Sequence, residues 1–175
     1  MQNTENFEST KELNGMTTQV FNLRDFRDAL GRFATGVTVV TALENGRTHG
    51  MTANAFTSVS LDPPLVLISL DNRSRMHRIL AAVRRCGISV LAEDQRALGD
   101  HFAGCANEPV HVSFVSRVGM PLLDGAVAYF VVRLVATHLA GDHTLYVGKV
   151  EHFESRGDKP LLFYAGSYQQ LARGG

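Results

Sequence analysis

Two long strand-like segments in the second half of the chain constrain its fold more than any other feature. Residues 126–139 and 144–154 are rich in Val, Leu and aromatic residues, and the second segment alternates with a period of two. Gly141-Asp142 stands between them and supplies a turn. Segments of this length, separated by so short a turn, pair as antiparallel neighbours. The chain is therefore expected to be built around an antiparallel sheet.

Shorter segments extend this sheet. Asn45-Gly46, a dipeptide typical of tight hairpins, separates strands predicted at 37–42 and 47–55. Further strands are predicted at 65–70, 87–92 and 161–164. About seven strands at hairpin spacing, with too few helices for repeated strand–helix–strand units, indicate a closed antiparallel β-barrel rather than a doubly wound sheet.

Three helices are predicted from apolar spacing and from residues that cap helix N-termini. The predicted helices are 23–34 after the cap Asn22, 75–85 after the cap Ser74, and a short helix after the cap Asp94 that ends near 102. Gly36 lies just beyond the first of them, where a glycine often ends a helix. A loop of low periodicity is expected over about 103–118.

The length and composition fit a single globular domain. The chain of 175 residues is expected to form one domain over 21–175, preceded by a flexible polar tail at 1–20. Apolar residues make up 45% of the chain and charged residues 19%, which is enough for a real core. The 17 basic and 17 acidic residues cancel, and this balance argues against nucleic acid as a partner.

The sequence carries no signal for export or membrane insertion. The N-terminus is polar and has no apolar signal segment, and the longest apolar run, 126–132, is too short to span a bilayer. Cys86 and Cys105 lack the spacing of a disulfide framework or a zinc site. These features predict no membrane partner and a cytoplasmic location with reduced thiols.

Residues 50–66 combine small and hydroxyl-bearing side chains and end in a Pro-Pro step before a strand. Thr52, Asn54 and Ser58 offer neutral donors and acceptors, while two alanines leave room for a ligand beside the backbone. Because the run contains no Lys or Arg, it suits a phosphate held by hydroxyls and backbone N–H groups. It equally fits a strand end and turn whose hydroxyls bond their own backbone.

Other common site signatures are missing from the sequence. There is no Gly-rich dinucleotide fingerprint, no phosphate-binding P-loop and no Gly-x-Ser-x-Gly hydrolase elbow. The seven histidines form no HxH or HxxxH pair, so no metal is expected.

Five motifs follow one another along the chain: Phe33–Thr41, Gly50–Val66, Ile88–Leu91, Gly141–His143 and Gly148–Val150. In this order and spacing they resemble those of the short-chain flavin reductase family, over about 26–168. The resemblance implies a split antiparallel β-barrel of the FMN-binding type with Greek-key topology, usually a homodimer. It also implies an NAD(P)H:flavin oxidoreductase, with NADH preferred, that serves a two-component flavin-dependent monooxygenase.

The resemblance implies a flavin site built from strand ends, one helix N-terminus and one covering aromatic ring. The flavin-binding residues implied in this way are Thr35, Gly36, Val37, Thr38, Thr52, Ala53, Asn54, Ala55, Ser58, Leu70, Asp71, Ser74, Ser89, Val90, Leu91 and Phe102. Many relatives have Ser where this chain has Ala55, so the choice between FAD and FMN stays open.

Two residues are candidates for binding NADH. His143 resembles the histidine of the family's Gly-Asp-His element, which positions the nicotinamide; its alternative role is that of a hydrogen-bonded turn histidine. Tyr168 could stack on the nicotinamide or adenine ring, or it could close one end of the barrel core.

The activity implied is hydride transfer from NADH to a non-covalently bound, exchangeable FAD or FMN, with catalysis by proximity and orientation. Reduced flavin then diffuses to a separate monooxygenase that hydroxylates an aromatic substrate. Two alternatives remain. A split-barrel FMN oxidase of the pyridoxamine-phosphate type needs a basic cluster for its substrate's phosphate, and a non-catalytic flavin-binding protein lacks a nicotinamide site.

Overall fold

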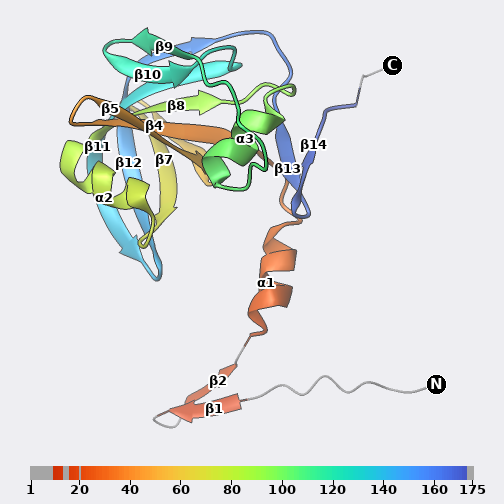
Figure 1. The fold of residues 1–175 in the computed structure, drawn as a ribbon. Helices are drawn as coiled ribbons and strands as arrows, with labels where there is room; N and C mark the ends of the chain where they lie inside the picture. Colours follow the sequence, from red (N-terminus) through yellow and green to blue (C-terminus); the bar gives the residue numbers. More distant parts are fainter. Residues whose placement is uncertain (1–9, 14–15, 20, 173–175) are drawn as a thin grey trace.

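The computed structural model describes residues 10–13, 16–19 and 21–172. Its centre is a seven-stranded sheet in the order β5-β4-β8-β11-β12-β7-β6, with every pairing antiparallel. The strands are β4 (Thr38–Glu44), β5 (Arg47–Ala53), β6 (Phe56–Leu61), β7 (Pro64–Asp71), β8 (Arg85–Val90), β11 (Ala128–Ala140) and β12 (His143–Ser155). The sheet curls around a core, as Figure 1 shows.

The barrel is split rather than closed. The edge strands β5 and β6 follow each other in the chain, yet neither pairs with the other within the described residues. The closed barrel expected from strand spacing alone is therefore corrected to the split barrel that the family resemblance implied. Spacing predicts hairpin pairs such as β4–β5 and β11–β12, but it does not predict whether the two edge strands meet.

Small strands complete the structure. They are β1 (Thr10–Leu13), β2 (Met16–Gln19), β3 (Thr35–Gly36), β9 (Phe114–Arg117), β10 (Met120–Leu123), β13 (Leu162–Tyr164) and β14 (Ser167–Gln169). β1 pairs with β2, β9 with β10, and β13 with both β3 and β14. The sequence predicted no strand in the tail at 1–20, of which 1–9, 14–15 and 20 lie outside the described residues. The flexibility of that tail stays a prediction.

Two predictions about strands were wrong. The segment 56–61 is strand β6. Its sequence shows no alternation of apolar and polar residues, because most of its side chains face outward. The loop expected over 103–118 contains strand β9, which turns into β10 through Val118 and Gly119 with φ angles of 47° and 75°. A strand of four residues is too short to show a period.

Within the described residues, three helices lie outside the sheet: α1 (Leu23–Leu30), α2 (Arg75–Val83) and α3 (Arg96–Ala103). Asn22 and Ser74 cap the first two as predicted, by accepting from backbone N–H groups at 2.9 and 3.1 Å. The predicted cap of the third was wrong, because Gln95 precedes α3 and makes no side-chain cap. α1 also ends at Gly31, before the predicted 34, since the chain leaves it to pair β3 with β13.

The core lies inside the curled sheet and under α2. Its main cluster includes Val40, Ile68, Leu80, Ile88 and Tyr146, all at most 2% exposed. The period of two in β12 is confirmed at its start, where Thr144, Tyr146 and Gly148 are buried in turn. The hairpin at Asn45-Gly46 is also confirmed, with φ angles of 51° and 75° at the two turn residues. Tight turns of this kind need such left-handed angles.

A second core cluster holds α3 and the C-terminal hairpin against β4. It contains Val37, Val39, Leu91, Leu123 and Leu161, with Phe102, Phe163 and Tyr168 packed on it. Gly50 allows α3 to lie directly on β5, because a Cβ atom at that position would come within 2.4 Å of the Phe102 ring. This contact fixes α3 beside the run at 50–58.

α1 stands away from the barrel in Figure 1 and buries none of its residues. Five large apolar side chains on and beside it are between 53% and 78% exposed. These residues, called the α1 stripe below, are Phe21, Leu23, Phe26, Leu30 and Phe33. Exposed apolar patches of this kind usually mark interaction sites, so we expect another surface to cover the α1 stripe.

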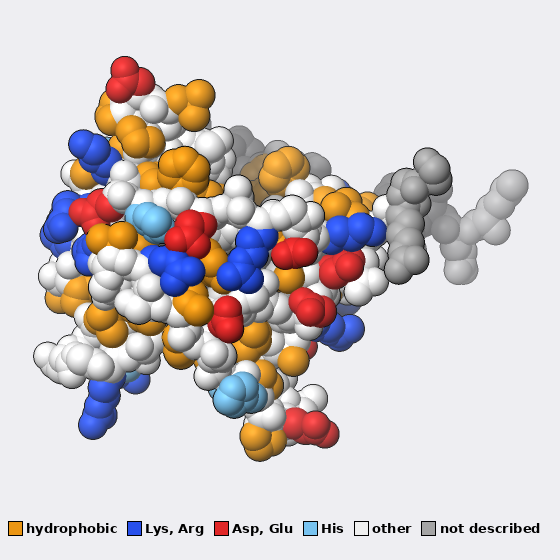
Figure 2. All heavy atoms as spheres, turned by 90° about the horizontal axis from the view of Figure 1, so that it is seen from above, with side chains coloured by type: hydrophobic (Ala, Val, Ile, Leu, Met, Phe, Trp, Pro, Cys, Tyr) orange, Lys and Arg blue, Asp and Glu red, His pale blue; other side chains and the backbone are white. Residues whose placement is uncertain are grey.

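One face of the molecule mixes both signs of charge (Figure 2). On the face seen in Figure 2, basic and acidic side chains alternate with hydrophobic patches. Both cysteines are free thiols: Cys86 is buried and Cys105 is exposed. None of the described helices is long and apolar enough to cross a membrane.

Candidate functional site

The first group of predicted site residues meets where β4 begins. Thr38 pairs in register with both Ala53 and Val90. The backbone N–H of Leu91 donates to the carbonyl of Val37 at 2.9 Å. The structure thus brings together residues from 35–38, 52–55 and 89–91 that are far apart in the sequence.

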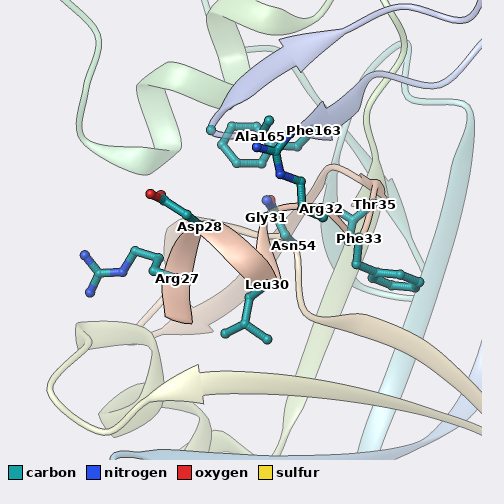
Figure 3. A pocket seen from close by; sticks show the side chains of 11 residues that line it. Arg27, Asp28, Leu30, Gly31, Arg32, Phe33, Thr35, Asn54, Phe163 and Ala165 are labelled. Carbon is teal, nitrogen blue, oxygen red and sulfur yellow. The ribbon is translucent and has the colours of Figure 1, made fainter. Parts of the chain in front are cut away.

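A cavity of about 660 Å³ opens beside this group. Its lining residues are Arg27, Asp28, Leu30, Gly31, Arg32, Phe33, Thr35, Asn54, Phe163, Ala165 and Gly166 (Figure 3). Of the predicted flavin residues, Thr35 and Asn54 lie in this lining. The cavity is formed between the end of α1, the corner after β5 and the β13–β14 hairpin.

Thr35 is one of the polar residues in the cavity lining. Its Oγ1 atom is buried and has no hydrogen-bond partner among the described residues. A buried polar atom without a partner is costly and rare in native structures, so a ligand or water is expected to complete it. The side chain of Asn54 is half-buried, and it too makes no hydrogen bond to a described residue.

The sequence analysis missed two arginines and an aromatic ring in this cavity. Arg27 and Arg32 come from α1 and the turn after it, and Phe163 comes from β13. The N–H of Ala165 donates to the carbonyl of Gly31 at 2.9 Å, which fastens the C-terminal hairpin to the end of α1. No local sequence pattern predicts a contact between residues so far apart in the chain, although Arg32 directly precedes the Phe33–Thr41 motif.

Three of the hydroxyls predicted to bind flavin already form hydrogen bonds with backbone groups of the protein. Thr38 donates to the carbonyl of Ala53, and Thr52 donates to the carbonyl of Gly99 at 2.7 Å. Ser89 is fully buried and accepts from the N–H of Leu123 at 2.9 Å. These bonds join segments that are far apart in the sequence, whereas the alternative role predicted for residues 50–66 was a bond to their own backbone.

The other predicted residues of the polar run lie on or beside β6. Ala55 is exposed, and its carbonyl accepts from the N–H of Ser69 at 3.0 Å. Ser58 is exposed on β6 opposite Val66. These contacts tie the corner after β5 to strand β7, whose last residues are Leu70 and Asp71.

A second group of predicted residues lies at the end of β7, outside the cavity lining. Asp71 pairs in register with His143 at the start of β12. The Arg73 guanidinium bonds the Asp71 carboxylate at 2.7 Å and holds the pKa of that carboxyl well below its usual range. Leu70 is buried in the core and Ser74 caps α2, so both have structural roles.

Phe102 and Tyr168 both pack in the second core cluster. Phe102 covers Gly50, and Tyr168 approaches Gly99 so closely that a Cβ there would meet its hydroxyl at 2.8 Å. Tyr168 stacks edge-on against Phe163 at 5.4 Å, and burial raises the pKa of its hydroxyl. This packing favours the barrel-closing role of Tyr168, while the Phe163 ring beside it reaches the cavity.

The residues present fit a flavin phosphate and its polar chain. Thr35 and Asn54 offer uncommitted hydrogen-bonding groups, and Arg32 supplies a cation that forms no ion pair with a described residue. An arginine fork is well matched to phosphate oxygens. No group of three or more potential metal ligands is present among the described residues.

Comparison with known proteins agrees with this geometry. Residues 30–172 match the flavin reductase like domain. An NADH-dependent flavin reductase of Rhodococcus sp is 53% identical over 148 residues, covering 83% of this chain and 84% of the relative. The reductase component of 4-hydroxyphenylacetate 3-monooxygenase from Thermus thermophilus is 39% identical, covering 83% and 95%.

A solved structure is also similar. The flavin reductase PheA2 in its native state superposes with a TM-score of 0.85 at 43% identity, covering 87% of this chain and all of that one. Its likeness extends over the whole split barrel rather than over isolated motifs. The chain belongs to the flavin reductase like domain family.

Proposed function

We propose that this protein is an NADH-dependent flavin reductase that reduces free FAD or FMN and supplies it to a separate monooxygenase component. The observation that carries the proposal is the cavity in which the orphaned hydroxyl of Thr35, the amide of Asn54 and the guanidinium of Arg32 come together. Related reductases with this activity support it. An aromatic compound as the oxygenase's substrate is part of the proposal.

The chain's own residues bind and orient the reactants. Thr35 and Asn54 hold the polar chain of the flavin by hydrogen bonds, and Arg32 neutralises its phosphate. When bound, flavin supplies the redox chemistry by accepting a hydride from NADH. The protein's contribution to the rate is to hold the two rings in a reactive arrangement.

His143 is proposed to position the nicotinamide part of NADH. It lies at the start of β12, opposite Asp71 at the end of β7, and the same strand β7 bonds the corner after β5 through Ser69 and Ala55. The residues implied by the family resemblance are still proposed to bind flavin. Where their side chains already form hydrogen bonds within the protein, they would do so through backbone groups.

The protein is further proposed to be a homodimer. The α1 stripe is exposed in the single chain, and a helix of eight residues with no buried side chain has little stability by itself. In a symmetric, isologous contact, each copy covers the α1 stripe of the other, so both stripes are buried at once. Free thiols at Cys86 and Cys105 support the proposed cytoplasmic location.

A steady-state assay tests the proposed activity. Oxidation of NADH is followed by its absorbance with enzyme alone, with FAD and with FMN. We expect rapid oxidation only when a flavin is added. A protein that binds flavin in a titration but oxidises no NADH would be a passive flavin carrier, and that result would contradict the reductase.

A further inference from the structure

The turn between β11 and β12 holds His143 in a defined hydrogen-bonded setting. Its Nδ1 atom lies 2.7 Å from Oδ1 of Asp142. The pKa of Asp142 is lowered, chiefly by this hydrogen bond, so its carboxylate is ionised at neutral pH and only accepts hydrogen bonds. Nδ1 must therefore carry the hydrogen. In the neutral ring, Nε2 is left with a free lone pair.

Asn72 fixes the turn that carries this pair. Its backbone N–H donates to the carbonyl of Asp142 at 3.0 Å, and its side-chain oxygen accepts from the Thr144 hydroxyl at 2.7 Å. Its side-chain NH₂ donates to the carbonyl of Gly141 at 3.4 Å. One residue at the end of β7 thus holds the turn on both sides of His143.

The other charges near His143 are already paired. Asp71 faces it across the strands, but Arg73 neutralises that carboxylate through a two-point contact. Asp142 is the carboxylate that hydrogen-bonds the imidazole, whereas Asp71 interacts with it through charge alone. The His143 side chain is 43% exposed, and its Nε2 has no partner among the described residues. The lone pair is open to a ligand.

We propose that Asp142 and Asn72 are positioning residues for NADH, because together they present Nε2 of His143 as a hydrogen-bond acceptor. Asp142 selects the Nδ1–H tautomer, and Asn72 holds the turn in place. The matching group on the ligand is a donor on the nicotinamide riboside, either the carboxamide NH₂ or a ribose hydroxyl. This inference rests on the proposed function, and it involves no proton transfer.

Nuclear magnetic resonance of ¹⁵N-histidine-labelled full-length protein reads the tautomer directly. His143 is assigned by the signals that disappear in His143→Gln, at a pH where the ring is neutral. We expect hydrogen on Nδ1 in the wild type and in Asp142→Asn, whose amide oxygen still accepts. In Asp142→Ala, the Nε2–H form should become populated. Hydrogen on Nε2 in the wild type would overturn the inference.

Kinetics test whether the tautomer matters for NADH. Asp142→Ala should lower kcat/KM for NADH about three- to tenfold, the value of one neutral hydrogen bond, mainly through KM. Flavin affinity should stay unchanged. Asn72→Ala should act in the same direction, and Asp142→Asn should remain close to the wild type. The matched control is Asp158→Ala, an exposed aspartate in the turn after β12.

The outcomes separate this inference from the proposed function. If Asp142→Ala changes the tautomer but leaves kcat/KM for NADH intact, Asp142 is only a turn residue. If Asp142→Asn is as impaired as Asp142→Ala, charge rather than tautomer is responsible, and the inference is wrong. A wild-type protein without flavin-dependent NADH oxidation contradicts the proposed function itself, whereas the tautomer spectra need no activity.

Discussion

At the scale of single residues, hydrogen-bond accounting separates hydroxyls that serve the fold from those left for a ligand. Thr38, Thr52 and Ser89 are satisfied by backbone groups, while Thr35 is buried with no partner. A sequence shows that all four side chains have hydroxyls. It does not show which of them the tertiary structure uses, because the partners of Thr52 and Ser89 lie 47 and 34 residues away.

Asn54→Leu should weaken flavin binding while the protein stays folded, because the side chain has no bond to a described residue to lose. Loss of one neutral hydrogen bond to the ligand corresponds to roughly a three- to tenfold or greater rise in Kd. A flavin fluorescence titration measures it. Asn107→Leu, in the exposed loop after α3, serves as control. An unchanged Kd would remove Asn54 from the site.

Arg32→Gln should reduce the preference for FMN over riboflavin, which lacks the phosphate. A hydrogen bond to a charged group is worth about 1.5–3 kcal/mol, so the ratio of the two affinities should fall about tenfold or more. The comparison with riboflavin cancels general effects on the cavity. Arg24→Gln, on α1 but outside the cavity lining, is the matched control. Equal losses for both flavins would argue against a phosphate contact.

At the scale of helices and strands, local patterns predict most of the fold but not the cavity. The Asn45-Gly46 hairpin, the caps of α1 and α2, and the long β11–β12 pair all follow from short-range signals. β6 escapes prediction because its side chains mostly face outward. The cavity could not be predicted from the sequence, because tertiary contacts alone bring its walls together. These walls are the end of α1 and the β13–β14 hairpin.

Gly50→Ala tests how closely α3 is fitted to β5. The added methyl group would lie 2.4 Å from the Phe102 ring, so the ring or the helix must shift. Overpacking of this kind costs about 1–3 kcal/mol of unfolding free energy. Urea denaturation measures the loss. Gly157→Ala, where a new Cβ meets nothing within 4 Å, should change stability little. Equal stability of both variants would show that α3 can move away from β5 without a cost in unfolding free energy, which would contradict the close fit.

At the scale of the whole molecule, α1 and the turn after it have two roles. They carry the exposed α1 stripe and also supply Arg27, Leu30 and Arg32 to the cavity, so that Leu30 belongs to both. A partner that covers the stripe therefore also fixes a wall of the proposed flavin site. Assembly and ligand binding are expected to support each other for this reason.

Leu23→Asp combined with Phe26→Asp should shift the protein from dimer to monomer, because charges replace two apolar side chains of the stripe. Sedimentation equilibrium across a range of protein concentrations measures the change. Two exposed residues on the same helix, Arg24 and Asp25, provide a control when exchanged for each other. A double variant with the mass of the wild type would place the dimer contact elsewhere.

The contrast between the two thiols offers a practical handle on these assemblies. Burial raises the pKa of Cys86 to about 12, whereas Cys105 is exposed just beyond α3. A maleimide dye, which reacts with accessible thiolates, is therefore expected to attach at Cys105 alone. Unmutated protein would then carry one fluorophore per chain. Mixing batches labelled with donor and acceptor dyes would report subunit exchange as energy transfer in real time.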